Sequence, residues 1–457
     1  HRVDRRQRQM CIRDRAYAKM SNAPAYAFMK LAFYDAFGFV EPLLGVVCLY
    51  VFFRYGGKLR TTLPLILLWL SVVVALVVWL SGMLIHPDLM RSSPKLEHLA
   101  RHFIFVFMAF WIAGSVRNAS IFWLAAVLGL LLAPWVKGDG WVEFMAGFEG
   151  VRPTFGLQNA QHVAVLFGIV LIGMLVFFRR IVFVPRFSGW RFAAWAIVFA
   201  YTLLILLLSQ TRAVYVALAS LLLITLGLLA VQWLLGRRTQ PLGWRSVLQW
   251  SFGGLVAGLL MLWVAVALNM VTPVYERFTD EMVVLDALAA GDLDAVPLNS
   301  LGSRVISWHA AAHWFLERPV LGWGSQGGKL VMQHTPWITD EPLISFGHLH
   351  SSYIEMLIRY GLLGALIYLV LIVWTGTGAW RAWKAGIMPT DFFLFFNLFF
   401  VYWLSVNVFE SYMFYWTGVY AFNVVMAVLL SFIWREQHGV IALSKKSSNQ
   451  MPARESQ

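Results

Sequence analysis

The sequence predicts an all-α protein that crosses a membrane about eleven times. Of its 457 residues, 60% are hydrophobic and only 13% are charged, roughly half the charged fraction of an ordinary soluble domain. So few charges could not cover a soluble fold of this length, whereas a lipid-facing surface needs no such cover. The 22 Trp residues agree with this prediction, because Trp concentrates where a membrane meets water.

Apolar stretches long enough to cross the ~30 Å hydrocarbon layer recur along the chain. We expect spans at about 38–54, 62–85, 99–117, 119–136, 160–178, 191–208, 213–235, 247–270, 352–376, 391–410 and 413–434. The third and fourth spans are separated only by Arg117 and Asn118, so their boundary is soft. Neither a secretory signal peptide nor a disulfide pattern is visible, since the two Cys residues are Cys11 and Cys48.

Basic residues in the short connections predict the orientation, because Lys and Arg collect on the cytoplasmic side. If the spans alternate, one side receives Arg54, Lys58, Arg60, Arg179, Arg180, Arg186, Arg191, Arg237, Arg238, Arg245, Arg381, Lys384, Arg435, Lys445 and Lys446. The outside then receives 86–98, 137–159, 209–212 and 271–350. The predicted organisation is therefore N-terminal transmembrane helices over 16–270, a periplasmic loop over 271–350, C-terminal transmembrane helices over 351–435 and a cytoplasmic tail over 436–457.

Residues 1–15 differ from everything that follows. They hold six Arg and two Asp, and so contribute +4 of the formal charge of +13. A basic arm can bind nucleic acid or anionic lipid, but we interpret this stretch as a non-native artefact and expect no nucleic-acid partner. A cytoplasmic C-terminus and an odd number of spans further predict a truncated reading frame, with a twelfth span in the parent protein. Residues 16–37 would then form the first outside loop.

The stretch 271–350 is too long for a passive connection. Ser303 is expected to cap a helix that runs from Arg304 to Leu316. Pro319 should end this helix, and the sequence LGWG at 321–324 should turn the chain.

Three arginines on the outside could bind an anion. Arg212 stands between two spans, Arg304 opens the loop helix, and Arg152 precedes a polar run that contains Gln158 and Asn159. A guanidinium forks onto phosphate oxygens, and amides suit sugar hydroxyls. The structural alternatives remain open: an interface anchor, a solvated helix residue and a capped helix start, respectively.

His348 and His350 come just before the chain re-enters the membrane. Histidine accepts a proton near neutral pH, although a lone interfacial histidine also occurs for structural reasons. Glu355 and Arg359 are spaced i, i+4 and are expected to pair.

We expect no metal and no cofactor. His309 and His313 share a helix face, but three Ala residues separate them where a metalloprotease carries its Glu. No glycine loop with Lys cradles a phosphate, and no aspartate-rich nucleotide-sugar signature is present. The sequence thus disfavours a cytosolic nucleotide sugar as donor.

The order of these motifs resembles the O-antigen ligase and polymerase family of bacterial membrane glycosyltransferases. The likeness covers about residues 40–435, and its motifs are QTRAVY at 210–215, GSR at 302–304, RPVLGWG at 318–324, HSSYIE at 350–355 and GLLG at 361–364. The run 152–159 is similar to the family's upstream Arg-Gly-Asn patch. Ser351 departs from the pattern, because many relatives have Asn there.

The resemblance implies a GT-C-like fold of about twelve helices with a large periplasmic helical loop, in the bacterial inner membrane and with its active site facing the periplasm. It implies a glycan donor on undecaprenyl pyrophosphate and a sugar hydroxyl of lipid A–core as acceptor. Arg212 and Arg304 would neutralise the departing pyrophosphate, and His350 would take the acceptor proton. The expected substrate-binding residues are Arg152, Gln158, Asn159, His348 and Tyr353. A ligase is preferred; an O-antigen polymerase, and a transporter of lipid-linked sugars from another class, are the alternatives.

Overall fold

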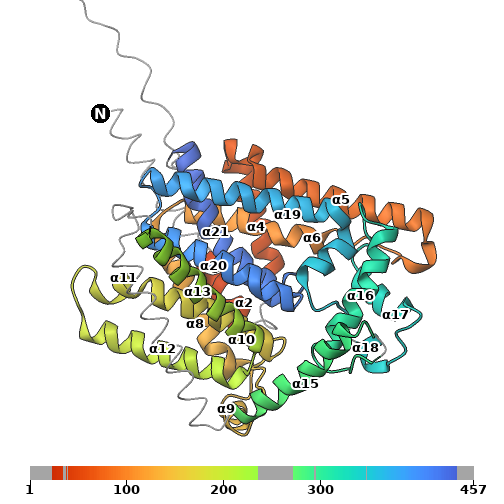
Figure 1. The fold of residues 1–457 in the computed structure, drawn as a ribbon. Helices are drawn as coiled ribbons and strands as arrows, with labels where there is room; N and C mark the ends of the chain where they lie inside the picture. Colours follow the sequence, from red (N-terminus) through yellow and green to blue (C-terminus); the bar gives the residue numbers. More distant parts are fainter. Residues whose placement is uncertain are drawn as a thin grey trace, which may run out of the picture.

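The computed structural model describes residues 23–33, 38, 40–234, 271–292, 295–345 and 347–439. This part of the chain is helical throughout and contains no strand (Figure 1). The first half consists of α2 (Ala23–Ala32), α4 (Val40–Tyr55), η1 (Gly57–Thr61), α5 (Leu63–Ile85), η2 (Pro87–Leu89), α6 (Glu97–Ala100), η3 (Arg101–Phe103), α7 (Phe105–Ile112), α8 (Val116–Val136), α9 (Trp141–Phe148), α10 (Ala160–Val176), α11 (Phe178–Phe183), α12 (Gly189–Ser209) and α13 (Arg212–Leu234). The second half consists of α15 (Val271–Ala289), α16 (Gly302–Glu317), α17 (Gly327–His334), α18 (Glu341–Ser345), α19 (Ser352–Lys384), α20 (Thr390–Phe409), η4 (Tyr412–Phe414) and α21 (Trp416–His438).

Six of the described helices, α5, α8, α12, α19, α20 and α21, are long and apolar enough to cross a membrane. Shorter apolar helical stretches lie at Gly45–Tyr55, Ala160–Val176 and Arg212–Thr225, within three further predicted spans. The predicted span 247–270 falls outside the described residues. The prediction of a polytopic helical membrane protein is therefore confirmed, whereas the number of spans stays a prediction.

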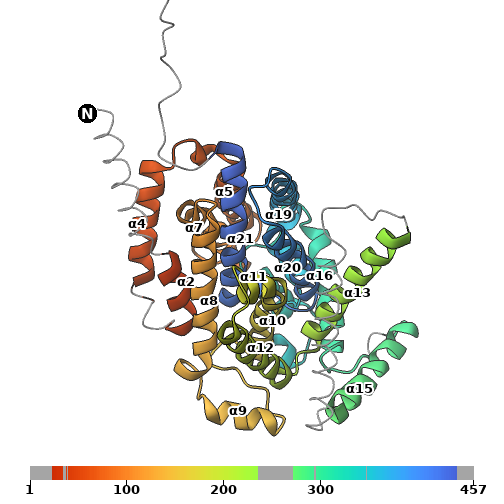
Figure 2. The same cartoon turned by 90° about the vertical axis from the view of Figure 1, so that its left-hand side faces the viewer.

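Helix α21 forms the centre of the bundle. Within its most apolar 18-residue window, 94% of the residues are buried. It packs against α7, α19, α10 and α20, and Figure 2 shows it enclosed while α4 and α13 lie at the periphery. Peripheral helices expose large apolar side chains such as Trp69, Leu124 and Ile197, which is the surface that lipid requires.

The predicted third span is irregular. Residues 97–112 are divided between α6, η3 and α7, and the chain then reverses through Ala113 and Gly114, both with positive φ. Asn423 of α21 compensates for the interrupted helix ladder, because its side chain accepts from Phe105 N (2.6 Å) and donates to Arg101 O (3.0 Å). The soft boundary near 117 is thus a tight turn.

Part of the expected first outside loop is helical. Helix α2 packs against α8, where a side chain at Gly129 would collide with Phe28 O at 2.4 Å. Tyr420 of α21 also donates to Ala27 O. Residues 23–32 therefore belong to the helical packing, because close helix contact at a glycine buries their apolar face.

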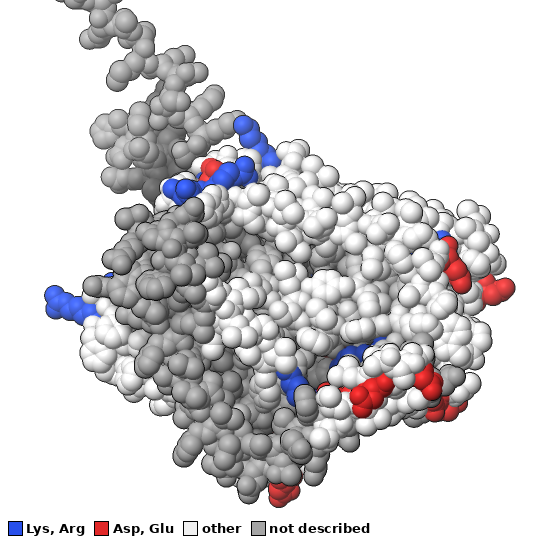
Figure 3. Space-filling view, viewed as in Figure 1, with Lys and Arg blue, Asp and Glu red and all other residues white. Residues whose placement is uncertain are grey.

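The connections assigned to the outside meet at one end of the bundle, which we call the loop end. Hydrogen bonds join residues 152 to 209, 304 to 409 and 326 to 89, and an ion pair joins 212 to 281. The opposite end, the basic end, holds the Arg180–Asp391 pair and the bond from Arg435 to Gly114 O (2.8 Å). Figure 3 shows Lys and Arg mostly at the upper left and Asp and Glu mostly at the right and lower right.

The loop helix α16 begins differently from the prediction. Ser303 is not its cap: Asn299 Oδ1 accepts from Leu301 N and Gly302 N, and the Ser303 hydroxyl donates to Asn299 O. The Asn299 side chain thus accepts from backbone N–H groups at the start of the helix, which have no partner within the helix itself. The helix ends at Glu317, before Pro319 as predicted.

The turn 321–324 fastens the loop to the membrane helix α19. Gly361 interrupts α19 with φ +59°, and the freed backbone exchanges bonds with the turn: Leu362 N to Pro319 O (2.9 Å) and Trp323 N to Ile358 O (2.7 Å). A side chain at Gly361 would meet Val320 O at 2.2 Å. Glycine is therefore required here both for the positive φ and for the close approach.

Candidate functional site

Two histidines and a glutamate form the centre of the candidate site. Glu410 follows α20 in extended conformation, and its carboxylate contacts His348 Nε2 at 3.1 Å and His350 Nδ1 at 3.3 Å. The Glu410 side chain is 3% exposed, while both histidines are partly accessible. The structure thus joins residues that stand sixty positions apart in the chain.

Glu410 is held as a carboxylate. Burial alone would raise the pKa of Glu410, but the hydrogen bonds from His348 and His350 outweigh it, and the pKa lies well below its usual range. Ser411 N donates a further bond to Oε1 (2.8 Å). An ionised acceptor at Glu410 requires N–H at Nδ1 of His350, so that the lone pair of a neutral imidazole lies on Nε2.

The backbone around His350 is strained. His350 adopts φ +51°, in the left-handed region that non-glycine residues avoid, at a cost of about 1–2 kcal/mol. Buried Ser352 supports this conformation: its hydroxyl lies 2.5 Å from Asn407 Oδ1 and accepts from Met413 N (3.2 Å). In this strained conformation the His350 imidazole lies beside the turn 410–415.

Arg304 and Arg212 lie in the same electrostatic neighbourhood as Glu410. Arg304 Nε donates to Phe409 O (3.3 Å) and Nη1 to Ser300 Oγ (2.7 Å). Burial lowers the pKa of Arg304, an effect that Glu410 opposes and Arg212 reinforces. The guanidinium stays protonated at neutral pH because its ordinary pKa is so high.

Arg212 is the first residue of α13, directly after the turn that ends α12. Its Nη1 lies 2.7 Å from Glu281 Oε1 of α15, and about a third of its side chain is exposed. In Figure 3, Lys or Arg side chains are visible in a hollow at the lower right that Asp and Glu border. The two predicted arginines therefore share one end of the molecule with the histidine–glutamate cluster.

Arg152 braces the turn that carries Arg212. Its Nε donates to Ser209 O (2.9 Å) and its Nη2 to Thr211 Oγ1 (3.0 Å). Tyr215 adds a bond from its hydroxyl to Leu206 O (2.7 Å). The Arg152 bonds hold the residues on both sides of Gln210, which has a positive φ.

The remaining predicted residues are distributed around the site. Asn159 caps α10 by accepting from Gln161 N and His162 N, and Gln158 is exposed. Tyr353 donates its hydroxyl to Leu404 O (2.8 Å). Asn159 thus has the structural role that was kept as an alternative, and no contact of Gln158 with the histidine cluster is recorded among the described residues.

Several residues could bear on metal binding. The ligand atoms of His348, His350 and Glu410 lie within 4.8 Å of one another, a spacing that could accept a divalent ion. His309 and His313 instead pack their rings 4.9 Å apart and against Trp337. If a metal ion binds at this site, the expected ligands are therefore His348, His350 and Glu410.

A family comparison covers the segment that builds most of this site. Residues 197–369 match the family model described as O-Antigen ligase, from within α12 to within α19. This segment of the chain is therefore similar to the O-antigen ligases. The resemblance to the O-antigen ligase and polymerase family is thereby confirmed, while no curated protein matches the sequence. Together with the apolar helices, the match points to a membrane protein that is similar to this family.

The matched segment includes Arg212, Arg304 and His350, but not Glu410, which contacts the histidine. Glu410 was missed because it stands at the edge of a predicted span, outside every motif. The available signal was an acidic residue between two spans on the predicted outside, where histidines also gather. The predicted Glu355–Arg359 pair is confirmed, with Arg359 Nε 2.8 Å from Glu355 Oε1.

Proposed function

We propose that this protein is an O-antigen ligase that transfers a glycan from undecaprenyl pyrophosphate to a sugar hydroxyl of lipid A–core. The observation that carries the proposal is the gathering of Arg212, Arg304 and the His350–Glu410 pair at the loop end. Cations for a diphosphate and a base for a hydroxyl are the two requirements of this reaction. The proposal places this end in the periplasm of the bacterial inner membrane, within a GT-C-like fold of about twelve spans.

In the proposed reaction, the acceptor oxygen attacks the anomeric carbon of the donor sugar. The bond from this carbon to the pyrophosphate oxygen breaks, and undecaprenyl pyrophosphate leaves with the electron pair. His350 Nε2 takes the acceptor proton, and Glu410, 3.3 Å from Nδ1, stabilises the resulting imidazolium. Such a positioned base contributes about 10²- to 10⁴-fold to the rate.

Arg212 and Arg304 would stabilise the departing pyrophosphate. Pyrophosphate is a competent leaving group, so its developing charge needs fixed cations more than a strong acid. Arg212 can exchange Glu281 for the donor, since a bidentate phosphate contact is at least as favourable as a carboxylate contact. His348 and Tyr353, with Arg152 as a brace of the 209–212 turn, would complete the substrate site.

The runner-up is an O-antigen polymerase, which uses the same donor but a second lipid-linked glycan as acceptor. A transporter of lipid-linked sugars is the alternative from another class. It predicts charged residues beside broken helices at the membrane midplane, whereas the arginines and histidines named above gather at the loop end.

The deciding experiment supplies the purified protein with a defined lipid-linked glycan and, separately, with lipid A–core or a second lipid-linked glycan. Glycan attached to lipid A–core supports the ligase, and elongated lipid-linked glycan would replace it with the polymerase. Movement of the donor across a bilayer without any transfer would replace both with the transporter.

A chelator arm of the same assay tests metal independence. We expect EDTA to leave the transfer rate unchanged, because His348 and His350 each contact Glu410 directly in a hydrogen-bonded cluster. Inhibition that a divalent ion reverses would instead indicate a metal at His348, His350 and Glu410.

A further inference from the structure

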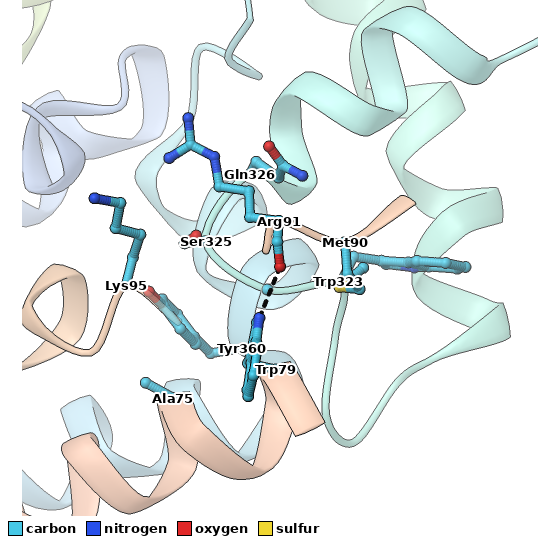
Figure 4. A pocket seen from close by; sticks show the side chains of 10 residues that line it. Ala75, Trp79, Met90, Arg91, Lys95, Trp323, Ser325, Gln326 and Tyr360 are labelled. Atoms are coloured by element: carbon cyan, nitrogen blue, oxygen red, sulfur yellow. Dashed lines mark hydrogen bonds between the residues drawn. The ribbon is translucent and has the colours of Figure 1, made fainter. Parts of the chain in front are cut away.

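A small pocket with two cationic side chains in its lining lies at the loop end, apart from the histidine cluster. It is formed by the end of α5, the segment that follows η2, and the turn 321–324, and its lining includes Trp79, Arg91, Lys95, Trp323 and Tyr360 (Figure 4). Figure 4 shows the Arg91 and Lys95 side chains extending to the same side of the pocket, with Tyr360 and Trp79 below them. We call this feature the Arg91–Lys95 pocket.

The Arg91–Lys95 pocket carries an excess of positive charge. Among the described residues, Lys95 has only a long contact to the largely exposed Glu97, at 3.8 Å, and no carboxylate forms an ion pair with Arg91. An anion placed in the pocket would therefore meet two cations that the carboxylates of the described residues neutralise only weakly.

A buried hydroxyl without a partner lines the pocket. Tyr360 is almost completely buried, and among the described residues its Oη lacks a hydrogen-bond partner. Unsatisfied buried polar atoms are uncommon in folded proteins, so a hydroxyl of this kind in the lining of a pocket indicates a polar ligand.

The aromatic rings of the pocket are held rigidly. Trp79 Nε1 donates to Arg91 O (2.9 Å), which fixes both the indole and the backbone that carries Arg91. Trp323 Nε1 donates to Trp314 O (2.8 Å), and the two rings pack 4.6 Å apart. Rigid amphipathic rings beside cations suit a ligand that has both an apolar ring face and a negative charge.

The segment 410–415 lies between the proposed base and two arginines that interact electrostatically with Tyr360 of the pocket. On one side of the segment 410–415, Glu410 contacts His350. On the other side, Phe414 O accepts from Arg101, and the Phe414 ring lies 4.6 Å from the Arg359 guanidinium. A substrate in the pocket could thus approach His350 from the side opposite to Arg304.

We propose that the Arg91–Lys95 pocket binds the phosphate group of a phosphorylated sugar of the acceptor glycan, while Arg212 and Arg304 take the donor. This inference rests on the proposed ligase function. It assigns the two substrates to separate cationic sites on either side of the turn 410–415.

The test measures binding of core oligosaccharide, released from lipid A–core, to the full-length protein in nanodiscs of neutral lipid. We expect the untreated oligosaccharide to bind at least about tenfold more tightly than its phosphatase-treated form. The double variant Arg91→Gln/Lys95→Gln should lose this preference. Lys329→Gln, which removes an exposed cation of α17, is the matched control and should keep it.

Equal binding of the two oligosaccharide forms by the wild type would overturn the proposal. So would loss of the preference when phosphatidylglycerol is added to the nanodiscs, which would assign the pocket to a lipid headgroup. Should the double variant fail to fold, Lys95→Gln alone, at a partly exposed position, should weaken binding at least threefold. The binding assay does not require glycan transfer, so the two proposals can fail separately. A wild type that binds the oligosaccharide but never transfers glycan would contradict the ligase function. An active double variant with an unchanged acceptor KM would contradict only the role of this pocket.

Discussion

At the scale of single residues, the proposed chemistry depends on which nitrogen of His350 carries its proton. Glu410 decides this, because an ionised acceptor beside Nδ1 leaves the lone pair on Nε2. The same carboxylate lies within electrostatic range of Arg304. One buried acidic side chain therefore orients the base and balances a neighbouring cation, and its removal should affect both activity and stability.

Glu410→Gln should lower kcat at least about 100-fold, by analogy with the loss of an orienting carboxylate in other histidine-based sites. Its stability effect should depend on pH. The pKa of Glu410 is lowered in the folded protein, so its contribution is fully present above the unfolded value of ~4.3 and is lost as pH falls through the lower folded value. The apparent Tm of wild type and variant should differ at pH 7, and the difference should begin to shrink below pH ~4; a difference that grows with acidification would contradict this account.

Arg212→Ala and His350→Ala should each reduce transfer about 10²-fold or more without impairing membrane insertion. The arginine change should remove roughly 3 kcal/mol of transition-state stabilisation, and the histidine change should remove the base. Initial rates with saturating acceptor measure both effects. Lys329→Ala, at an exposed position of α17, is the control, and near-wild-type transfer by either site variant would remove that residue from the mechanism.

At the scale of elements, the loop and the membrane helices are joined at the glycine break in α19. The turn 321–324 replaces the helix bonds that Gly361 interrupts, and Trp323 inserts its buried ring beneath α16. Because α16 carries Arg304 and the N-terminus of α19 follows His350, this junction sets the distance between two site residues. We therefore expect Gly361 of the GLLG motif to position the two site residues.

Gly361→Ala should lower both apparent Tm and transfer rate. A left-handed alanine costs about 1–2 kcal/mol, and its Cβ would displace Val320 O, only 2.2 Å away. Gly376→Ala in the same helix is the matched control, because that Cβ meets nothing within 4 Å and alanine favours the helix by roughly 0.5–1 kcal/mol. Thermal inactivation profiles should separate the two variants, and equal profiles would argue against the docking role.

At the scale of the whole molecule, charge distinguishes the two ends of the bundle. Arg180, Arg381 and Arg435 belong to connections at the basic end, whereas Arg212, Arg304 and Glu410 meet at the loop end. Retention of Lys and Arg on the cytoplasmic side then orients the loop end outward. This orientation is required if the donor glycan and the acceptor meet at the outer surface of the membrane.

Cysteine labelling tests this orientation. In a variant without Cys11 and Cys48, Lys329→Cys should react with a membrane-impermeant maleimide in spheroplasts, because it is exposed at the loop end. Arg60→Cys, exposed at the basic end, should react only after permeabilisation. The reverse pattern would invert the topology and place the candidate site in the cytoplasm.

Apolar runs by themselves determined a helical membrane protein, and the motifs QTRAVY, GSR and HSSYIE predicted the family resemblance and the arginines and histidines of the candidate site. Length and hydrophobicity suffice for spans, since every backbone group in lipid must be paired within the segment. Length and hydrophobicity do not suffice at 97–112, where the helix is interrupted and Asn423 of α21 bonds to the freed backbone groups. They also do not suffice at α2, which packs against α8.

Only the tertiary structure decided that Glu410 orients His350, that Asn299 caps α16, that Arg152 bonds to the 209–212 turn and that Arg91 and Lys95 line a second pocket. These are relations between side chains that are distant in the chain or depend on backbone direction. Local propensity and hydropathy carry no information about such pairs, because their energy arises only when packing brings the groups within a few ångströms. The sequence therefore predicted several of these residues, but it could not predict which side chains they contact.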